Sequence, residues 1–505
     1  MKRILALLVA ATFAAQTWAQ TSFIVDSLKY TIVDADKHYV SVGDISYEES
    51  PTGDLVIPST VENKGITYIV TELNFQRCYK LTSVIIPNSV TSINDNAFND
   101  CLGLLSVVIP NTVKGIGKSA FSSCDKLSSV IIPDSVTSIG DGAFFGCDSL
   151  KSINIPNSVV SVGCEAFCLC SCLTSITIPN SITCINKGTF LGCRGLTSVD
   201  IPNTIISIGD EAFMDCDSLS SLTIPNSVTS IGNHAFCGSG LVSIAIPNSV
   251  TSIGDGVFSD CHNLTSVTIP NSITNINGMF HNCYSLTSVV IPNSITTIGS
   301  SAFERCRSLE SVTIPNSVTS IGRNAFSGCK NLTTIDIPNS VATIGYGAFS
   351  ECRGLTSVTI PNSVTNINPF AFSSCDNLKS VTLPNSITSI ANGVFSGCDS
   401  LQQIVIPESV TSIGDEAFWL CESLTSVIIP NTVTSIGSSV FWGCLSLSSI
   451  VIPSSVIKMG EGVFGNSIYD NRFFYTTIHC KAKSKPKKWN KEWNAVNYPV
   501  IWGEE

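Results

Sequence analysis

The sequence predicts a β-rich solenoid of about seventeen stacked 23-residue repeats that form one long parallel sheet. Three observations lead to this fold class. A proline preceded by Ile or Leu recurs from Pro87 to Pro453 at a step of 23 residues, apart from two steps of 22. A leucine stands six residues before each of these seventeen prolines. In sixteen of the seventeen, a cysteine stands nine residues before the proline and a phenylalanine twelve before it.

Each repeat is expected to contain one short strand. In the segment Leu264–Pro270, the apolar Val267 and Ile269 alternate with polar residues, which is the period of a strand with one buried face. Proline has no backbone N–H, so each strand should end there after three or four residues. The later apolar positions should turn inward without a long helix. Stacking on neighbours should supply the stabilisation that a single repeat lacks.

The two ends of the chain are expected to differ from the array. Residues 1–19 read as a signal peptide, because Lys2 and Arg3 precede a short apolar run. Residues 20–80 should form a β-rich N-terminal cap and an irregular repeat, with a hairpin between Val61 and Leu73. The solenoid itself should span residues 81–465, and residues 466–505 should form a small C-terminal cap.

The Lys- and Trp-rich tail allows two interpretations. Six lysines lie within residues 481–491, and Trp489, Trp493 and Trp502 lie among or after them. The favoured interpretation is a cap, in which the tryptophans cover the last repeat and the lysines face solvent. The alternative is a site for acidic glycans or other anions.

The charge balance excludes one class of partner. The chain has a formal net charge of −11, and only 13% of its residues are charged. Nucleic-acid binders carry a basic face, so no nucleic-acid partner is expected. No apolar stretch of the ~18 residues needed for a membrane helix follows residue 19, so no transmembrane segment is expected in the mature chain. We expect a secreted or cell-surface protein.

The repeat resembles a known family. The pattern L-x-x-V-x-I-P-x-S-V-x-x-I-x-x-x-A-F-x-x-C, clear in Asn88–Leu104 and Asn316–Leu332, is similar to the BspA-like leucine-rich repeats. The resemblance covers about residues 55–480, and Cys480–Pro486 resembles the closing segment of such proteins. It implies a leucine-rich-repeat solenoid that is secreted or displayed on the cell surface. It also implies adhesion to extracellular-matrix or host surface proteins. The family has no shared catalytic residues that could be assigned to positions in this chain.

No catalytic residue, metal ligand or cofactor site is predicted. The five histidines occupy different repeat columns and are not expected to cluster (His38, His234, His262, His281 and His479). Most of the 22 cysteines should form a ladder of small buried side chains. A local disulfide among the denser set is the alternative (Cys164, Cys168, Cys170, Cys172 and Cys184).

The candidate binding residues are those expected to face outward from the sheet. They lie two residues before each marker proline, in a column that is apolar at both ends of the array and mostly polar in the middle. We expect two apolar patches on the concave face, separated by a hydroxyl-lined trough that carries two aspartates. The candidates are Ile85, Val108, Ile131, Asp200, Asp336, Val405, Ile428 and Val451. A protein partner is favoured, and a polysaccharide bound by the Ser/Thr/Asn face or the tail is the alternative.

Overall fold

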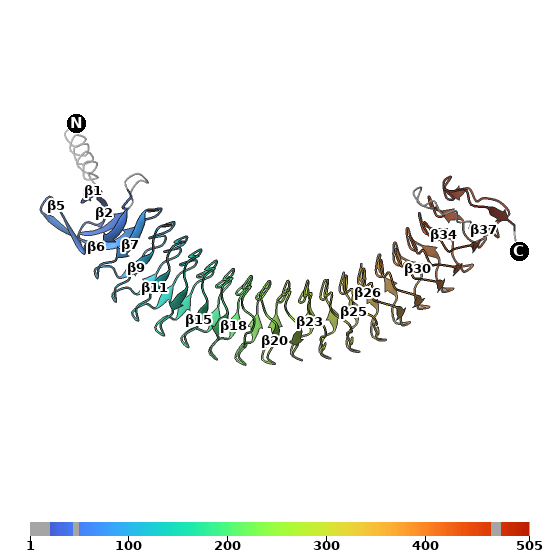
Figure 1. The fold of residues 1–505 in the computed structure, drawn as a ribbon, viewed down its shortest axis with the longest axis horizontal. Helices are drawn as coiled ribbons and strands as arrows, with labels where there is room; N and C mark the ends of the chain where they lie inside the picture. Colours follow the sequence, from blue (N-terminus) through green and yellow to red (C-terminus); the bar gives the residue numbers. More distant parts are fainter. Residues whose placement is uncertain (1–20, 44–49, 466–475, 504–505) are drawn as a thin grey trace, which may run out of the picture. The chain divides into compact units, whose positions relative to one another are not determined.

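The computed structural model describes residues 21–43, 50–465 and 476–503, so the predicted signal peptide lies outside the described residues. The chain divides into two compact units, Met1–Leu219 (unit 1) and Ser220–Glu505 (unit 2). Within each unit, successive turns of the chain lie side by side in sequence order (Figure 1). The predicted β-rich leucine-rich-repeat solenoid is confirmed, and the described residues contain no helix.

Unit 1 begins with a small sheet of strand order β1-β2-β3-β6-β5. Its strands are β1 (Ser22–Val25), β2 (Leu28–Asp34), β3 (Tyr39–Gly43), β5 (Thr60–Asn63) and β6 (Ile66–Asn74). The antiparallel pair β5–β6 is the hairpin expected between Val61 and Leu73. Strand β4 (Gly53–Val56) instead pairs in parallel with the first strand of the repeats.

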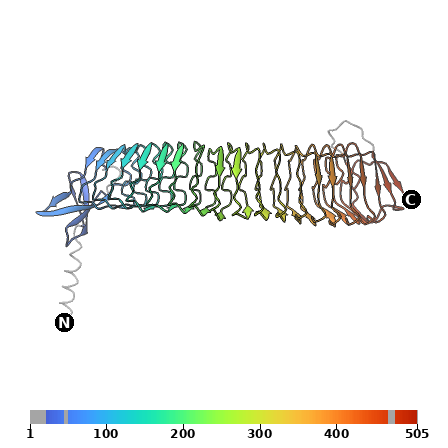
Figure 2. The same ribbon diagram turned by 90° about the horizontal axis from the view of Figure 1, so that it is seen from below.

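The segment before each proline forms a parallel ladder, called here the first ladder. Val107 and its equivalents face the core, while the residues on either side of them face solvent. Figure 2 shows these strands in unit 1 as a row of arrows along one side of the stack. In unit 1 they are β7 (Leu81–Ile85), β9 (Ser106–Val108), β11 (Ser129–Ile131), β13 (Ser152–Asn154), β15 (Ser175–Thr177) and β17 (Ser198–Asp200).

The first ladder recurs in unit 2. Isolated bridges Thr268↔Val290, Val290↔Thr313 and Thr313↔Asp336 continue it where no full strand forms. Its strands are β20 (Ser243–Ala245), β22 (Ser266–Thr268), β27 (Ser357–Thr359), β29 (Ser380–Thr382), β31 (Gln403–Val405), β33 (Ser426–Ile428), β35 (Ser449–Ile452), β37 (Thr477–Cys480) and β39 (Val500–Trp502).

A second parallel ladder, absent from the sequence prediction, forms at the Ser-Ile pair that precedes the glycine. In unit 1 its strands are β8 (Ser92–Ile93), β10 (Gly115–Ile116), β12 (Ser138–Ile139), β14 (Ser161–Val162), β16 (Cys184–Ile185) and β18 (Ser207–Ile208). In unit 2 they are β19 (Ser230–Ile231), β21 (Ser252–Ile253), β23 (Asn275–Ile276), β24 (Thr297–Ile298), β25 (Ser320–Ile321), β26 (Thr343–Ile344), β28 (Asn366–Ile367), β30 (Ser389–Ile390), β32 (Ser412–Ile413), β34 (Ser435–Ile436), β36 (Lys458–Met459) and β38 (Lys488–Trp489).

The expectation of a single long sheet is therefore corrected to two ladders, each made of short sheets. The proline ends each first-ladder strand within a few residues, and the chain then bends into the second ladder. A glycine follows the second-ladder strand because the backbone of the preceding turn lies too close for a side chain. A Cβ at Gly345 would lie 2.5 Å from the carbonyl carbon of Gly322 in that turn.

The third side of each turn carries the phenylalanine and cysteine columns. The backbone N–H of Phe326 donates to the carbonyl of Ala348 in the next turn at 2.7 Å. Within each unit the phenyl rings stack, as in Phe303–Phe326, whose centroids are 5.2 Å apart. The Sγ of Cys352 donates to the carbonyl of Phe326 at 3.1 Å. Stacked rings and inter-turn hydrogen bonds thus join each turn to its neighbours, which makes stability cooperative along the stack.

The C-terminal residues cover the end of unit 2. The side chains of Trp489 and Trp493 are 4% and 5% exposed, and Trp493 packs edge-on against Phe464 at 5.9 Å. The Nε1–H of Trp489 donates to the carbonyl of Val456 at 3.1 Å. This arrangement supports the interpretation of the tail as a cap, and it removes two tryptophans from the alternative glycan site.

Candidate functional site

The outward column of the first ladder is exposed at every candidate position. In unit 1, Ile85, Val108 and Ile131 are 45%, 56% and 82% exposed. In unit 2, Val405, Ile428 and Val451 are 65%, 64% and 48% exposed. Asp200 and Asp336 are exposed as well. In strands such as β9 and β31 the residue before the outward side chain is buried. Because side chains alternate along a strand, the next side chain points to solvent.

Patch one comprises Val56, Ile85, Val108 and Ile131 in unit 1. Val56 pairs with Ile85, and Ile85 pairs with Val108, in adjacent parallel strands. Ile131 lies at the same position of β11, which packs beside β9. A shallow groove runs here, and its lining includes Val56, Ile85, Val108, Pro87 and Pro110. Val56 was not among the predicted residues, although it stands two residues before Pro58, as the predicted ones stand two residues before their prolines.

Patch two comprises Val405, Ile428, Val451 and Ile501 in unit 2. Val405 pairs with Ile428, and the next strand in the ladder carries Val451. His479 pairs with Val451 on one side and with Ile501 on the other. Ile501, 44% exposed, therefore extends this patch past the last repeat. No sequence pattern identified Ile501, because β39 lies outside the 23-residue register.

Outside the patches the same column carries mostly polar side chains. In unit 2 they include Thr268, Thr313, Asp336 and Thr359. Val290, which is 81% exposed, interrupts this polar run. Each unit thus presents its own apolar patch on the first ladder, and polar residues occupy the rest of the column.

A polar cluster in unit 2 corrects the expectation that the histidines are dispersed. The Nδ1 of His281 lies 3.3 Å from the Oγ of Ser259, and Ser259 also donates to Asp260 at 3.1 Å. Although burial alone would raise it, hydrogen bonds from Asn282 and Ser259 and the charges of His281 and His262 lower the pKa of Asp260. Ser259 and His281 occupy the same column of two adjacent turns that lie 22 residues apart, as do Asp260 and Asn282, so the ordinary stacking of the turns brings these side chains together.

This cluster lacks the arrangement of a hydrolytic triad. In a triad the carboxylate accepts a hydrogen bond from the imidazole and so orients it toward the nucleophile. Here the carboxylate of Asp260 accepts hydrogen bonds from Ser259 and Asn282 instead. Among the described residues, no group of three or more His, Cys, Asp and Glu side chains is placed to hold a metal ion.

The cysteine column is a buried ladder of free thiols, as expected. The denser set also forms no disulfide: Cys164 and Cys172 are exposed, and Cys168 and Cys170 are buried. Burial raises the pKa of Cys193 to about 12 and holds the pKa of Cys352 well above its ordinary value. Because the thiolate is the reactive form, the buried column is chemically inert and serves packing.

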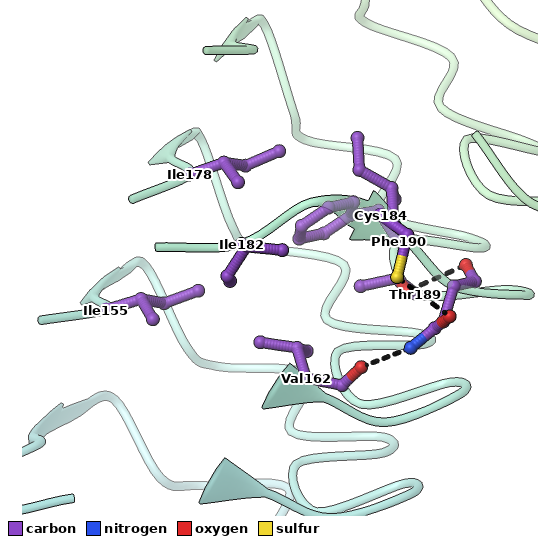
Figure 3. Close-up of a pocket in the computed structure, with 9 residues that line it drawn as sticks. Ile155, Val162, Ile178, Ile182, Cys184, Thr189 and Phe190 are labelled. Carbon is purple, nitrogen blue, oxygen red and sulfur yellow. Dashed lines mark hydrogen bonds between the residues drawn. The ribbon is translucent and has the colours of Figure 1, made fainter. Parts of the chain in front are cut away.

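A small, partly open cavity lies beside Cys184 in unit 1 (Figure 3). Its volume is about 10 Å³, and its lining includes Ile155, Val162 and Phe190. The Nδ2 of Asn186 donates to the carbonyl of Val162 at 2.6 Å. A space of this size holds about one water molecule. It is a packing defect at the turn where Cys184 and Asn186 replace the serine and glycine of most other repeats.

No helix in the described part of the chain has the length and hydropathy needed to cross a membrane. A search of curated proteins gave no match.

Solved structures include clear relatives of this chain. A leucine-rich repeat protein from Bacteroides ovatus is 31% identical over 77% of this chain and 95% of its own, with a TM-score of 0.62. A leucine-rich cell surface protein from Faecalibacterium prausnitzii is 28% identical over 86% of this chain and 94% of its own, with a TM-score of 0.33. The family described as "BspA type Leucine rich repeat region (6 copies)" matches residues 67–197, 183–279, 277–368 and 343–471. The chain belongs to the BspA-type leucine-rich-repeat family.

Proposed function

We propose that this protein is an adhesin-like protein, secreted or held at the cell surface, that binds a host or extracellular-matrix protein through the outward column of the first ladder. BspA-type proteins are often surface proteins with binding roles, and solenoids of this kind are generally non-catalytic scaffolds. The observation that carries the proposal is the alignment of exposed apolar side chains along the first ladder, at 44–82% exposure in both patches. In patch one all four stand on neighbouring strands, and in patch two three do, with Ile501 one strand further on, beyond His479.

Exposure of this kind favours a binding role over a purely structural one. Apolar side chains in contiguous exposed clusters mark interaction sites. β-branched residues suit strands in general, but Thr provides the same branching at this position in several middle repeats. Valine or isoleucine at the patches therefore adds apolar area without being needed for the strand. Asp200 in unit 1 and Asp336 in unit 2 would supply polar contacts from the same column as the patch of each unit.

Substituting Val405, Ile428 and Val451 with serine tests the proposal. We expect a loss of protein binding of at least tenfold, because each buried apolar side chain contributes roughly 1.5–3 kcal/mol on full burial. The corresponding change at Ile85, Val108 and Ile131 tests patch one. Binding to an immobilised panel of extracellular-matrix proteins, measured by surface plasmon resonance, gives the readout.

A matched control exists directly before three strands of the second ladder, β14, β18 and β36. Val160, Ile206 and Ile457 are 63%, 52% and 53% exposed and are also β-branched. Serine at these three positions should leave binding unchanged. Equal losses in the control and patch variants, or unchanged binding in both patch variants with the fold intact, would refute the proposal.

A further inference from the structure

One surface column of unit 2 departs from the uniformity of the repeats. It consists of the residue directly after the column cysteine in eight consecutive turns, called here the charge stripe. Its members are Tyr284, Arg307, Lys330, Arg353, Asp376, Asp399, Glu422 and Leu445. In all eight turns a cysteine precedes the stripe residue, and a leucine stands two residues after it. The stripe thus carries three cations, then three anions, with one apolar or aromatic residue at each end.

The charged side chains of the stripe are accessible and closely spaced. Arg307, Arg353, Asp399 and Glu422 are exposed, and Lys330 and Asp376 are half-buried. Ring centroids of the neighbouring phenylalanine column lie 5.2 to 5.9 Å apart from Phe303 to Phe418, which gives the distance between turns. Within the stripe, opposite charges meet at the junction, where Arg353 and Asp376 form an ion pair at 3.4 Å.

Rows of like charge do not stabilise an isolated chain, because neighbouring charges of the same sign repel one another. Burial, followed by the neighbouring carboxylates of Asp376 and Glu422, raises the pKa of Asp399. The guanidinium of Arg307 lies over the ring of Tyr284 at 4.4 Å, and neither Arg307 nor Lys330 forms an ion pair with a described residue. The free charges of the stripe are therefore placed to meet opposite charges on a partner.

We propose that two copies of this chain associate through their charge stripes, antiparallel to one another, about a two-fold axis between the turns of Arg353 and Asp376. An isologous interface of this kind pairs each position with its mirror position in the other copy. Arg307 then faces Glu422, Lys330 faces Asp399, and Arg353 faces Asp376. Tyr284 faces Leu445 at both ends, so the apolar ends also match.

The spacing of the turns favours a second copy over another partner. Charges that recur once per turn keep their register only against a surface with the same repeat distance, and a second copy has that distance by identity. This inference does not rest on the proposed function, because the stripe lies outside the first ladder.

Charge-swap variants of the full chain test the dimer. One variant carries R307E, K330E and R353E, and the other carries D376K, D399K and E422K. We expect the unaltered chain to sediment with twice the mass of one chain in 50 mM salt. It should dissociate in 1 M salt, where charges are screened beyond about 3 Å. Each variant alone should be monomeric, and their equimolar mixture should form a one-to-one dimer.

A control variant changes the same number of charges elsewhere, at K114E, K118E and K151E in unit 1, and should remain dimeric. Circular dichroism checks that every variant is folded. A monomeric unaltered chain in 50 mM salt, dimers that persist in either swap variant alone, or a mixture that stays monomeric would each overturn the inference.

Discussion

Replacing Phe326 with alanine is expected to destabilise unit 2 by about 3–5 kcal/mol, the range for removing a buried aromatic side chain. Phe326 is fully buried and stacks between Phe303 and Phe349 at 5.2 and 5.3 Å. Its removal leaves a cavity and breaks two ring contacts at once. In a repeat protein this loss weakens the interfaces on both sides of the altered turn.

Hydrogen exchange measured by mass spectrometry would locate the effect. We expect amide protection to fall first in the turns around residue 326, together with a lower urea midpoint. Tyr346→Ala is the matched control, because Tyr346 is an aromatic residue of the neighbouring turn that is 43% exposed. Equal losses in the two variants would contradict the assignment of the phenylalanine column as the core.

Replacing both Trp489 and Trp493 with alanine is expected to free the C-terminal end of the stack. Each buried aromatic contributes about 3–5 kcal/mol. The rings lie 4.9 Å apart, so their contributions should be less than additive. Loss of Trp489 also leaves the carbonyl of Val456 without its indole donor.

The expected result is rapid hydrogen exchange over the last turns, near β35 and β36, while the turns near residue 300 keep their protection. Trp419→Ala provides the control, since Trp419 is 36% exposed on the surface of an earlier turn. Unchanged exchange near β35 in the double variant would show that these tryptophans do not cap the stack.

The repeated columns explain why much of the fold could be predicted. Val267 and Ile269 alternate with polar residues over enough positions to indicate a strand and its buried face. The same alternation indicated that Ile85 and Val405 face outward, as the structure shows. The second ladder was missed because a strand of two residues, such as Ser320–Ile321, is too short for alternation to be visible.

Other features depend on contacts that a column comparison does not contain. His281 lies beside Ser259 of the same column in the preceding turn, a contact that a comparison of the histidines with one another does not reveal. Ile501 joins patch two through the pairing of β39 with β37, far from any repeat signature. Sequence periodicity thus determines positions within the array, whereas irregular turns and end strands require the three-dimensional structure.

Binding of the purified mature chain to a panel of extracellular-matrix proteins and polysaccharides, at low and high salt, tests the central claim most directly. Contacts between apolar side chains are not screened by ions, whereas contacts of the lysine tail would be. The account predicts binding to a protein that persists at high salt. Binding only to polysaccharides, or binding lost on raising the salt, would contradict it and point to the polar face or the tail.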